Sequence, residues 1–432
     1  MRYRWRDLPH LFVTPAGRAQ LREGVHFRLW PVTSRAAALY RRTVARRTRV
    51  VAVVGSFGKS TTMRAVAMVL ETAPASLLNN AWGAVSRAVL RIRRGQRHAV
   101  IEVGIADVGQ MRRYARVVRP DITVVTSIGS EHHRSLRTLD VTRDEKAWMV
   151  RALGPGGIAV LNGDDANVMW MASQTRARIV TYGFGEACEV RAVDVQLDWP
   201  RGMRFRLVAF GTERAVALRL VGRHMVYPAL AALAVAQVEG MPLDEAIARV
   251  SALEPTLGRM QLVALPNGVT VIRDEFKSAI ETIEAALEVF GEVPARRRIA
   301  VLGDISEPPD RQQHAAYRRI GTMVGGVADR MLITGRMHDD YVSGARRAGL
   351  PDRSISVTGR TPQAIAAELS ALLEPGDVVL LKGRDTERLA RVALILQGRT
   401  VRCDIRECTL RTVGCDSCAM LERGWGNHRV VM

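Results

Sequence analysis

Two patterns of hydrophobic and polar positions alternate from about residue 50 of this 432-residue chain. Short apolar runs, such as VVAVV at 50–54 and AVIEV at 99–103, predict buried strands. Longer segments between them, such as TMRAVAMVLETA at 62–73, have the apolar spacing of a helix. Repetition of strand, loop and helix is typical of a parallel sheet with helices on both faces. The pattern predicts an α/β fold.

Breaks in this pattern predict how the chain is organised. Three segments of alternating polarity between 190 and 220 indicate antiparallel strands, and a helical region at about 227–253 follows them. A second series of strands and helices begins after Gly258. We therefore predict a basic N-terminal segment, a central domain, a C-terminal domain and a Cys-rich tail, at residues 1–48, 49–257, 258–400 and 401–432.

The string GSFGKST follows the first predicted strand and opens a predicted helix. This arrangement gathers backbone amides and the positive end of a helix around a phosphate. Lys59 would hold the terminal phosphates of ATP and Ser60 its magnesium ion, although Val53 replaces the first glycine of the longer P-loop consensus. The predicted nucleotide-binding positions here are Gly55, Ser56, Gly58, Lys59, Ser60 and Thr61.

Only four of the 63 basic residues are lysines, namely Lys59, Lys146, Lys277 and Lys382. Each lies in a string that suggests catalysis or nucleotide handling: GSFGKST, RDEKAW, RDEFKS and LLKGRD. Lysine is a compact charge that can lose its proton and react, whereas arginine stays charged. The distribution favours an ATP-using site, so the central domain is predicted to be a P-loop ATPase domain on a parallel sheet.

The net charge of +20 does not by itself indicate nucleic-acid binding. The arginines are spread along the chain, and the aromatic content of 5% offers no stacking platform, so we expect no nucleic-acid partner. Acidic substrates or an anionic membrane surface fit the charge equally well. The sequence has neither an apolar run approaching the roughly 18 residues of a membrane span nor a secretory signal, so we expect a cytoplasmic protein.

The first fifty positions of the chain contain twelve arginines. Residues 34–49 are predicted to form a helix with apolar residues at Ala36, Leu39, Tyr40 and Val44. Such a stripe could pack on the protein's own body, or it could rest on anionic lipid or on a partner protein.

A series of strings after the glycine loop resembles the Mur ligases, most closely the branch that adds D-alanyl-D-alanine to the muropeptide. The resemblance covers about residues 50–397 and implies a smaller, Rossmann-like α/β C-terminal domain. It also implies an ADP-forming, ATP-dependent ligase that joins a carboxylate to an amine through an acyl phosphate. The matching strings include NNAWGAVSRAVL, IEVGIADVGQM, RPDITVVTSIGSEHH, LNGDD, LGRMQ, TVIRDEF, IAVLGDISE and VLLKGRD.

The resemblance implies roles for several residues of the central domain. Glu102 matches the family's magnesium carboxylate, and His132 matches the histidine that helps to bind a second magnesium ion. Lys146 falls where a carbamylated lysine is often found. Asn162 is implied to lie near the nucleotide, with Thr126 and Ser127 around it.

In the C-terminal domain the resemblance implies that Arg259 reaches the ATP phosphates, Asp274 contacts the nucleotide and Lys382 approaches the acyl phosphate. The pattern departs at Lys277, where the branch has an asparagine, and this lysine could contact a phosphate or a substrate carboxylate instead. Three further residues lie where the branch positions its amine, but a solvated loop explains them equally well: Asp304, Glu307 and His314.

Only the arginine-rich segment precedes the glycine loop, whereas the peptidoglycan enzymes carry a domain there that grips the UDP end of their substrate. We therefore expect a carboxylate substrate, small or polymeric, that is not held through UDP, together with an amine donor. Two rival functions stay open. One is a nucleotide-binding regulatory or scaffold protein with the same fold, and the other is a phosphoryl-transfer enzyme or NTPase.

Four of the five cysteines lie near the C-terminus, separated by four, six and two residues. Cys403, Cys408, Cys415 and Cys418 could close a structural zinc site in a segment too short to fold by core burial alone. Free thiols and redox-paired cysteines are the alternatives.

Overall fold

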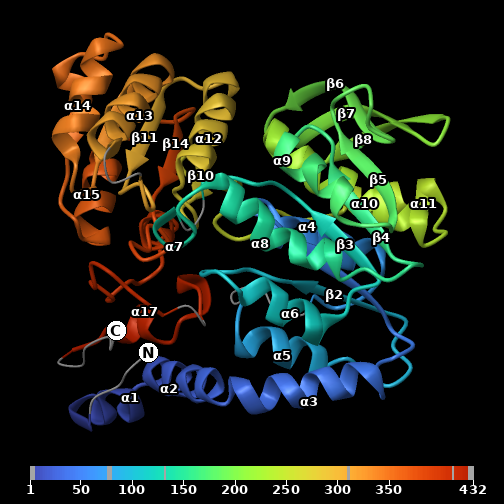
Figure 1. Ribbon diagram of the computed structural model, residues 1–432. Helices are drawn as coiled ribbons and strands as arrows, with labels where there is room; N and C mark the ends of the chain where they lie inside the picture. The colour runs from blue at the N-terminus through green and yellow to red at the C-terminus, as the bar shows by residue number, and fades with distance from the viewer. Residues whose placement is uncertain (1–4, 75–79, 131–132, 309–311, 411–412, 427–432) are drawn as a thin grey trace. The chain divides into compact units, whose positions relative to one another are not determined.

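The computed structural model describes residues 5–74, 80–130, 133–308, 312–410 and 413–426 (Figure 1). The chain divides into two compact units. We call His26–Glu254 the central unit, and Met1–Val25 together with Pro255–Met432 the C-terminal unit. Among the helices of the described residues, none is both long and apolar enough to cross a membrane.

The central unit is built on an eight-stranded sheet with the order β2-β1-β3-β4-β5-β6-β7-β8. Neighbouring strands from β2 to β6 are parallel, and β6, β7 and β8 pair antiparallel, as the sequence predicted. The strands are β1 (Arg49–Val54), β2 (His98–Glu102), β3 (Ile122–Val125), β4 (Ile158–Asn162), β5 (Arg178–Gly183), β6 (Val190–Asp198), β7 (Gly202–Ala209) and β8 (Thr212–Leu218).

Strand β1 lies between β2 and β3. The chain therefore adds β2 on one edge of β1 and then crosses over to add β3 on the other edge, so the direction of strand order reverses at β1. In open parallel sheets, ligands bind beyond the carboxyl ends of the strands at such a reversal of strand order. The carboxyl ends of β1, β2 and β3 therefore mark the part of the central unit where a nucleotide site is expected.

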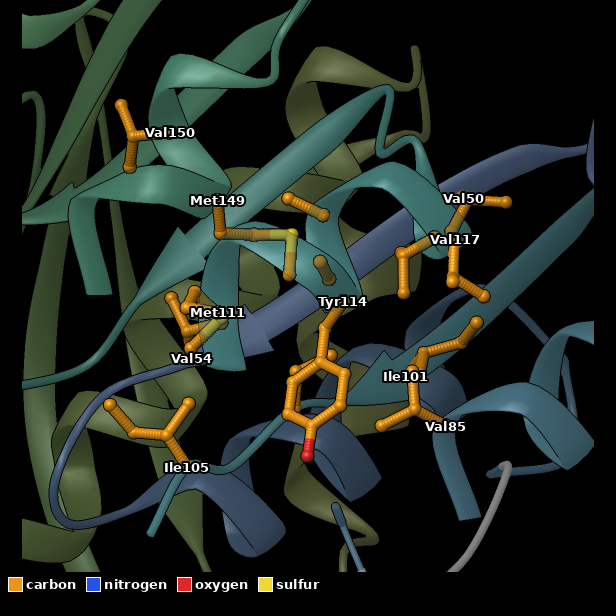
Figure 2. Close-up of a cluster of buried hydrophobic side chains, with 14 of the residues drawn as sticks. Val50, Val54, Val85, Ile101, Ile105, Met111, Tyr114, Val117, Met149 and Val150 are labelled. Carbon is orange, nitrogen blue, oxygen red and sulfur yellow. The ribbon is translucent and has the colours of Figure 1, made fainter. Parts of the chain in front are cut away.

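Helices cover both faces of this sheet. A buried cluster between the sheet and one helical layer contains Val50 and Val54 of β1, Val85 of α5, Tyr114 of α6 and Met149 of α8 (Figure 2). Helices α4 and α10 pack together and contact the sheet strands, and α10 has ten buried residues because it is apolar all round. The helices are α3 (Trp30–Arg42), α4 (Lys59–Val69), α5 (Gly83–Leu90), α6 (Gln110–Val118), α7 (His133–Leu136), α8 (Leu139–Arg151), α9 (Ala166–Met169), α10 (Val226–Val238) and α11 (Leu243–Ser251).

The C-terminal unit contains a six-stranded sheet with the order β13-β12-β11-β14-β10-β9, in which only β9 runs antiparallel. Strands β10 to β14 correspond to the series of strands predicted after Gly258, whereas the short edge strand β9 was not predicted. The strands are β9 (Gln261–Ala264), β10 (Thr270–Asp274), β11 (Arg298–Leu302), β12 (Arg330–Ile333), β13 (Ile355–Val357) and β14 (Val378–Lys382). Its helices are α12 (Ile280–Glu292), α13 (Gln313–Val327), α14 (His338–Arg347), α15 (Pro362–Leu372), α16 (Ala390–Leu396) and α17 (Met420–Arg423).

Helices also form ahead of β1, as α1 (Leu8–Val13), α2 (Pro15–Arg28) and α3. The helix predicted at 34–49 begins earlier, at Trp30, because Pro31 occupies a first-turn position where its missing N–H is not needed. It ends at Arg42, and Arg49 already belongs to β1. Ala16 of α2 packs with Leu410, Met420 and Trp425 in a small hydrophobic cluster of the C-terminal unit.

Candidate active site

The glycine loop connects the end of β1 to the start of α4. Gly55 has φ +144° and Gly58 has φ +79°, two conformations that side-chain-bearing residues rarely adopt. A Cβ atom on Gly55 would also overlap the hydroxyl of Thr126. Glycine is therefore required at Gly55 by both backbone conformation and space. Ser60 and Thr61, in the first turn of α4, are buried directly behind the loop.

Residues that follow β3 hold the glycine loop in place. The backbone N–H of Phe57 donates to Ser127 Oγ at 3.0 Å, and the hydroxyl of Thr126 donates to the carbonyl of Phe57 at 2.5 Å. Asn162, at the end of β4, donates through Nδ2 to the carbonyl of Thr126 at 2.8 Å. Thr126 and Ser127 thus order the backbone of the loop, and Asn162 holds Thr126 in place.

Two of the four lysines converge on Ser56. Lys59 Nζ donates to the carbonyl oxygen of Ser56 at 2.7 Å, and Lys146 Nζ, from α8, donates to Ser56 Oγ at 2.9 Å. Both lysines are buried. The two lysine amines lie beside the positive end of α4 and the backbone amides of the loop, an arrangement that is suited to a polyphosphate.

Glu102 ends β2, and its backbone pairs with Val53 immediately before the glycine loop. Its carboxylate is buried and accepts a hydrogen bond from Asn80 Nδ2 at 2.6 Å. A carboxylate and the Ser60 hydroxyl are hard oxygen ligands, and magnesium usually takes one or two such ligands together with phosphate oxygens and water. The donor set therefore fits magnesium, while His132 lies outside the described residues.

Asp274 and Lys382 form a buried ion pair at the carboxyl edge of the second sheet. They end the neighbouring parallel strands β10 and β14 and stand opposite each other in the register. Asp274 Oδ1 also accepts from the backbone N–H of Met260 at 3.0 Å. Burial raises the pKa of Asp274 and lowers the pKa of Lys382, and their mutual attraction opposes both shifts.

Arg259 lies close to this pair. Its guanidinium stacks over the ring of Phe276, 4.9 Å from the ring centroid, and its charge acts on Asp274. Half-buried Lys277 follows Phe276 in the chain. The C-terminal unit thus brings together Arg259, Asp274 and Lys382, and it adds Phe276 as a platform that the sequence analysis missed.

The three residues expected near the amine lie along one segment of the chain, from the end of β11 to the first turn of α13. Asp304 is buried after β11 and accepts from Arg384 Nη2 at 3.0 Å and from the backbone N–H of Arg336 at 2.6 Å. His314 is largely exposed and its Nδ1 lies 2.7 Å from Asp340 Oδ2. Glu307 lies on the loop between β11 and α13 with φ +47°.

Three arginines around Asp304 were missed. Arg336 and Arg360 come three residues after the ends of β12 and β13, and Arg384 comes two residues after the end of β14, in the strings TGR, TGR and KGR. The guanidinium of Arg360 lies 3.8 Å from Asp304 Oδ2. The repeated Gly-Arg after a buried strand is the signal that could have identified them, because the carboxyl ends of parallel strands meet at one edge.

The structure does not support the predicted zinc site. Cys403 is buried with Leu410, Met420 and Trp425, and its sulfur accepts a hydrogen bond from Arg391 Nη1 at 3.3 Å. Burial raises the pKa of Cys415 to about 12. Over the part of the chain that the structure describes, no three His, Cys, Asp or Glu side chains gather as metal ligands. Cys403, Cys408, Cys415 and Cys418 are free cysteines.

Comparisons with known proteins agree with this geometry. Residues 53–236 match the Mur ligase middle domain, and residues 258–384 match the Mur ligase glutamate ligase domain. The chain is 31% identical over 382 residues to the UDP-N-acetylmuramoyl-tripeptide--D-alanyl-D-alanine ligase of Mycobacterium tuberculosis, covering 83% of this chain and 74% of that protein.

Two solved structures share the fold. A crystal structure of MurF from Acinetobacter baumannii matches with a TM-score of 0.76 at 22% identity, over 86% of this chain and 81% of that one. The MurF ligase of Thermotoga maritima in complex with ADP matches with a TM-score of 0.75 at 19% identity, over 85% and 83%. The α/β fold predicted from the sequence is confirmed, and the chain belongs to the Mur ligase family.

Proposed function

We propose that this protein is an ATP-dependent, ADP-forming ligase that joins a carboxylate to an amine through an acyl phosphate. The observation that carries the proposal is the convergence of Lys59 and Lys146 on Ser56, in a glycine loop beside the buried carboxylate of Glu102. The family match and the ADP complex of a structural relative support the use of ATP.

The proposed reaction has two steps. A carboxylate oxygen of the acid attacks the γ-phosphorus of ATP, the bond to the β-phosphate oxygen breaks, and ADP leaves. The amine then attacks the carbonyl carbon of the acyl phosphate, inorganic phosphate leaves with one oxygen of the acid, and the nitrogen loses a proton. Positioning and neutralisation of charge supply most of the rate enhancement for such a transfer.

The central unit supplies the phosphate-binding groups. Backbone amides of the glycine loop and the ammonium of Lys59 bind the terminal phosphates. Ser60 and Glu102 would hold magnesium, which, when bound, neutralises the charge that develops on the phosphate oxygens, and His132 is proposed as a further ligand. We propose that Lys146 is carbamylated, since only an amine forms a carbamate and the resulting anion would be a further oxygen ligand.

The C-terminal unit supplies the remaining proposed groups. Arg259 is oriented by Phe276 and would bind a phosphate, and Asp274 holds Lys382 in a fixed position. Lys382 would neutralise charge on the acyl phosphate. Lys277 would contact a phosphate or the substrate carboxylate, where the D-alanyl-D-alanine-adding branch has an asparagine.

For the acid, we propose a substrate that is not held through UDP. The described residues ahead of β1 form helices, and the last of these, α3, packs on α5 and α6 of the central unit. Recognition of the acid would then rest on the carboxylate and its neighbourhood.

The proposal is tested with the full chain, ATP, magnesium and panels of acids and amines, by measuring ADP and the mass of any product. ADP should form only when a suitable acid and amine are both present, with a product equal to their summed mass less one water. Lys59→Ala should abolish both signals. Nucleotide binding without ADP formation in every combination would favour the regulatory alternative, and ADP formation independent of any acid would favour an NTPase.

A further inference from the structure

The outward face of α3 carries aliphatic and arginine side chains in alternation. Val32, Arg35, Leu39 and Arg42 are spaced three and four residues apart, which places them on one helix face. All four are exposed, Val32 at 65% and Leu39 at 64% of their full surface. The exposed Arg28 precedes this stripe.

The inward face of the same helix is fixed to the central unit. The ring of Trp30 lies edge-on to Trp82 and Tyr114, with centroids 5.9 and 5.4 Å away. The buried guanidinium of Arg41 pairs with Asp121 at 2.8 Å, and the hydroxyl of Tyr40 donates to a carbonyl at 2.6 Å. Because these contacts hold the helix, the outward stripe is not needed for its packing.

Among the residues that the structure describes, no acidic side chain forms an ion pair with the arginines of the outward stripe, Arg35 and Arg42. The sequence has no aspartate or glutamate between Glu23 and Glu71, so no acidic residue shares the helix or its flanks. The stripe is therefore a positive surface that also exposes two branched aliphatic side chains.

We propose that this stripe binds an anionic phospholipid surface, with α3 lying parallel to the membrane plane. Arg35 and Arg42 would meet lipid phosphates, while Val32 and Leu39 would enter the boundary between headgroups and acyl chains. A nucleic acid would use the arginines but would gain nothing from the aliphatic pair, and the stripe offers no aromatic ring for stacking. The inference does not depend on the proposed ligase activity.

The arginines are tested by sedimentation of the full-length protein with vesicles of phosphatidylcholine, with or without phosphatidylglycerol. The protein should bind only the vesicles that contain phosphatidylglycerol, and less tightly at high salt. Each arginine is expected to raise the partition coefficient into the vesicles about fivefold. The double variant Arg35→Gln with Arg42→Gln should therefore lower this coefficient about 25-fold. Arg347→Gln with Arg353→Gln removes the same charge from exposed sites in the C-terminal unit and should change it less than about twofold.

The aliphatic pair separates a membrane from other anionic partners. Val32→Ser with Leu39→Ser keeps the charge and should lower binding to the same vesicles at least about tenfold, because buried CH₂ groups are lost. Unchanged binding by this variant would assign the stripe to a purely electrostatic partner and overturn the proposal. Absence of binding to anionic vesicles, or equal losses in both arginine pairs, would also overturn it. Thermal unfolding of each variant checks that the fold is intact.

Discussion

Lys146 Nζ lies 2.9 Å from Ser56 Oγ, although 90 residues separate them in the chain. The contact joins the middle of α8 to the glycine loop that follows β1. A lysine at this point can be read in two ways, as an ammonium that binds phosphate or as an amine that forms a carbamate, and the two make different predictions.

Lys146→Arg should reduce turnover roughly a hundredfold or more, because the longer, planar guanidinium cannot form a carbamate or keep the position of the ammonium. Phosphate release in the presence of acid and amine is the measurement. If a carbamate is used, wild-type activity should also fall when bicarbonate is removed and recover when it is restored. Full turnover by Lys146→Arg would remove the carbamate from the mechanism.

Gly55→Ala should weaken ATP binding at least about tenfold, because an added Cβ at φ +144° overlaps Thr126 and strains the loop. Isothermal titration with ATP and magnesium measures the effect. Gly211→Ala is the matched control, since Gly211 also has a positive φ of +77° but has open space for a Cβ atom. Equal losses of affinity in the two variants would show that the loop does not bind the nucleotide.

Asp274→Leu should lower the free energy of unfolding by about 3–5 kcal/mol, because it leaves the buried ammonium of Lys382 without its carboxylate. Adding Lys382→Met should restore most of this stability, since the buried charge is then removed, but it should not restore turnover. Urea unfolding and phosphate release distinguish the two effects. If the double variant is as unstable as Asp274→Leu alone, the unpaired ammonium of Lys382 is not the cause of the instability.

Glu239→Gln should destabilise the protein by about 1.5–3 kcal/mol near neutral pH. Partial burial acts to raise the pKa of Glu239, but hydrogen bonds from Arg49 and His98 outweigh it, so the pKa is lowered. A lowered carboxyl pKa contributes stability that is present above the unfolded pKa of about 4.3 and is lost as the pH falls through the folded pKa. The gap between wild type and variant should therefore shrink below about pH 4, and a gap that does not change with pH would be inconsistent with this linkage.

The sequence allowed the strands and the glycine loop to be predicted because each depends on local signals. Runs such as 50–54 are apolar throughout, and Gly55 and Gly58 mark the turn between strand and helix. In the parallel sheet β2 lies beside β1, so Glu102 lies opposite Val53. Strand β9 was missed because its four residues pair only at a sheet edge, where burial is incomplete.

Contacts between distant segments could not be read from the sequence. Nothing local shows that Phe276 supports Arg259, or that Asn80 donates to Glu102. The spacing of the four C-terminal cysteines suggested zinc, but spacing does not determine where a sulfur points, and Cys403 turns toward Arg391 and a hydrophobic cluster. The motifs identified candidate residues, whereas tertiary packing determines which of these residues are in contact.

The acyl phosphate is tested most directly by following one oxygen atom. An acid labelled with ¹⁸O in its carboxyl group is incubated with the protein, ATP, magnesium and the amine, and the inorganic phosphate is analysed by mass spectrometry. If an acyl phosphate forms, each amide made should transfer one labelled oxygen to phosphate. Amide formation with unlabelled phosphate would contradict the acyl-phosphate step.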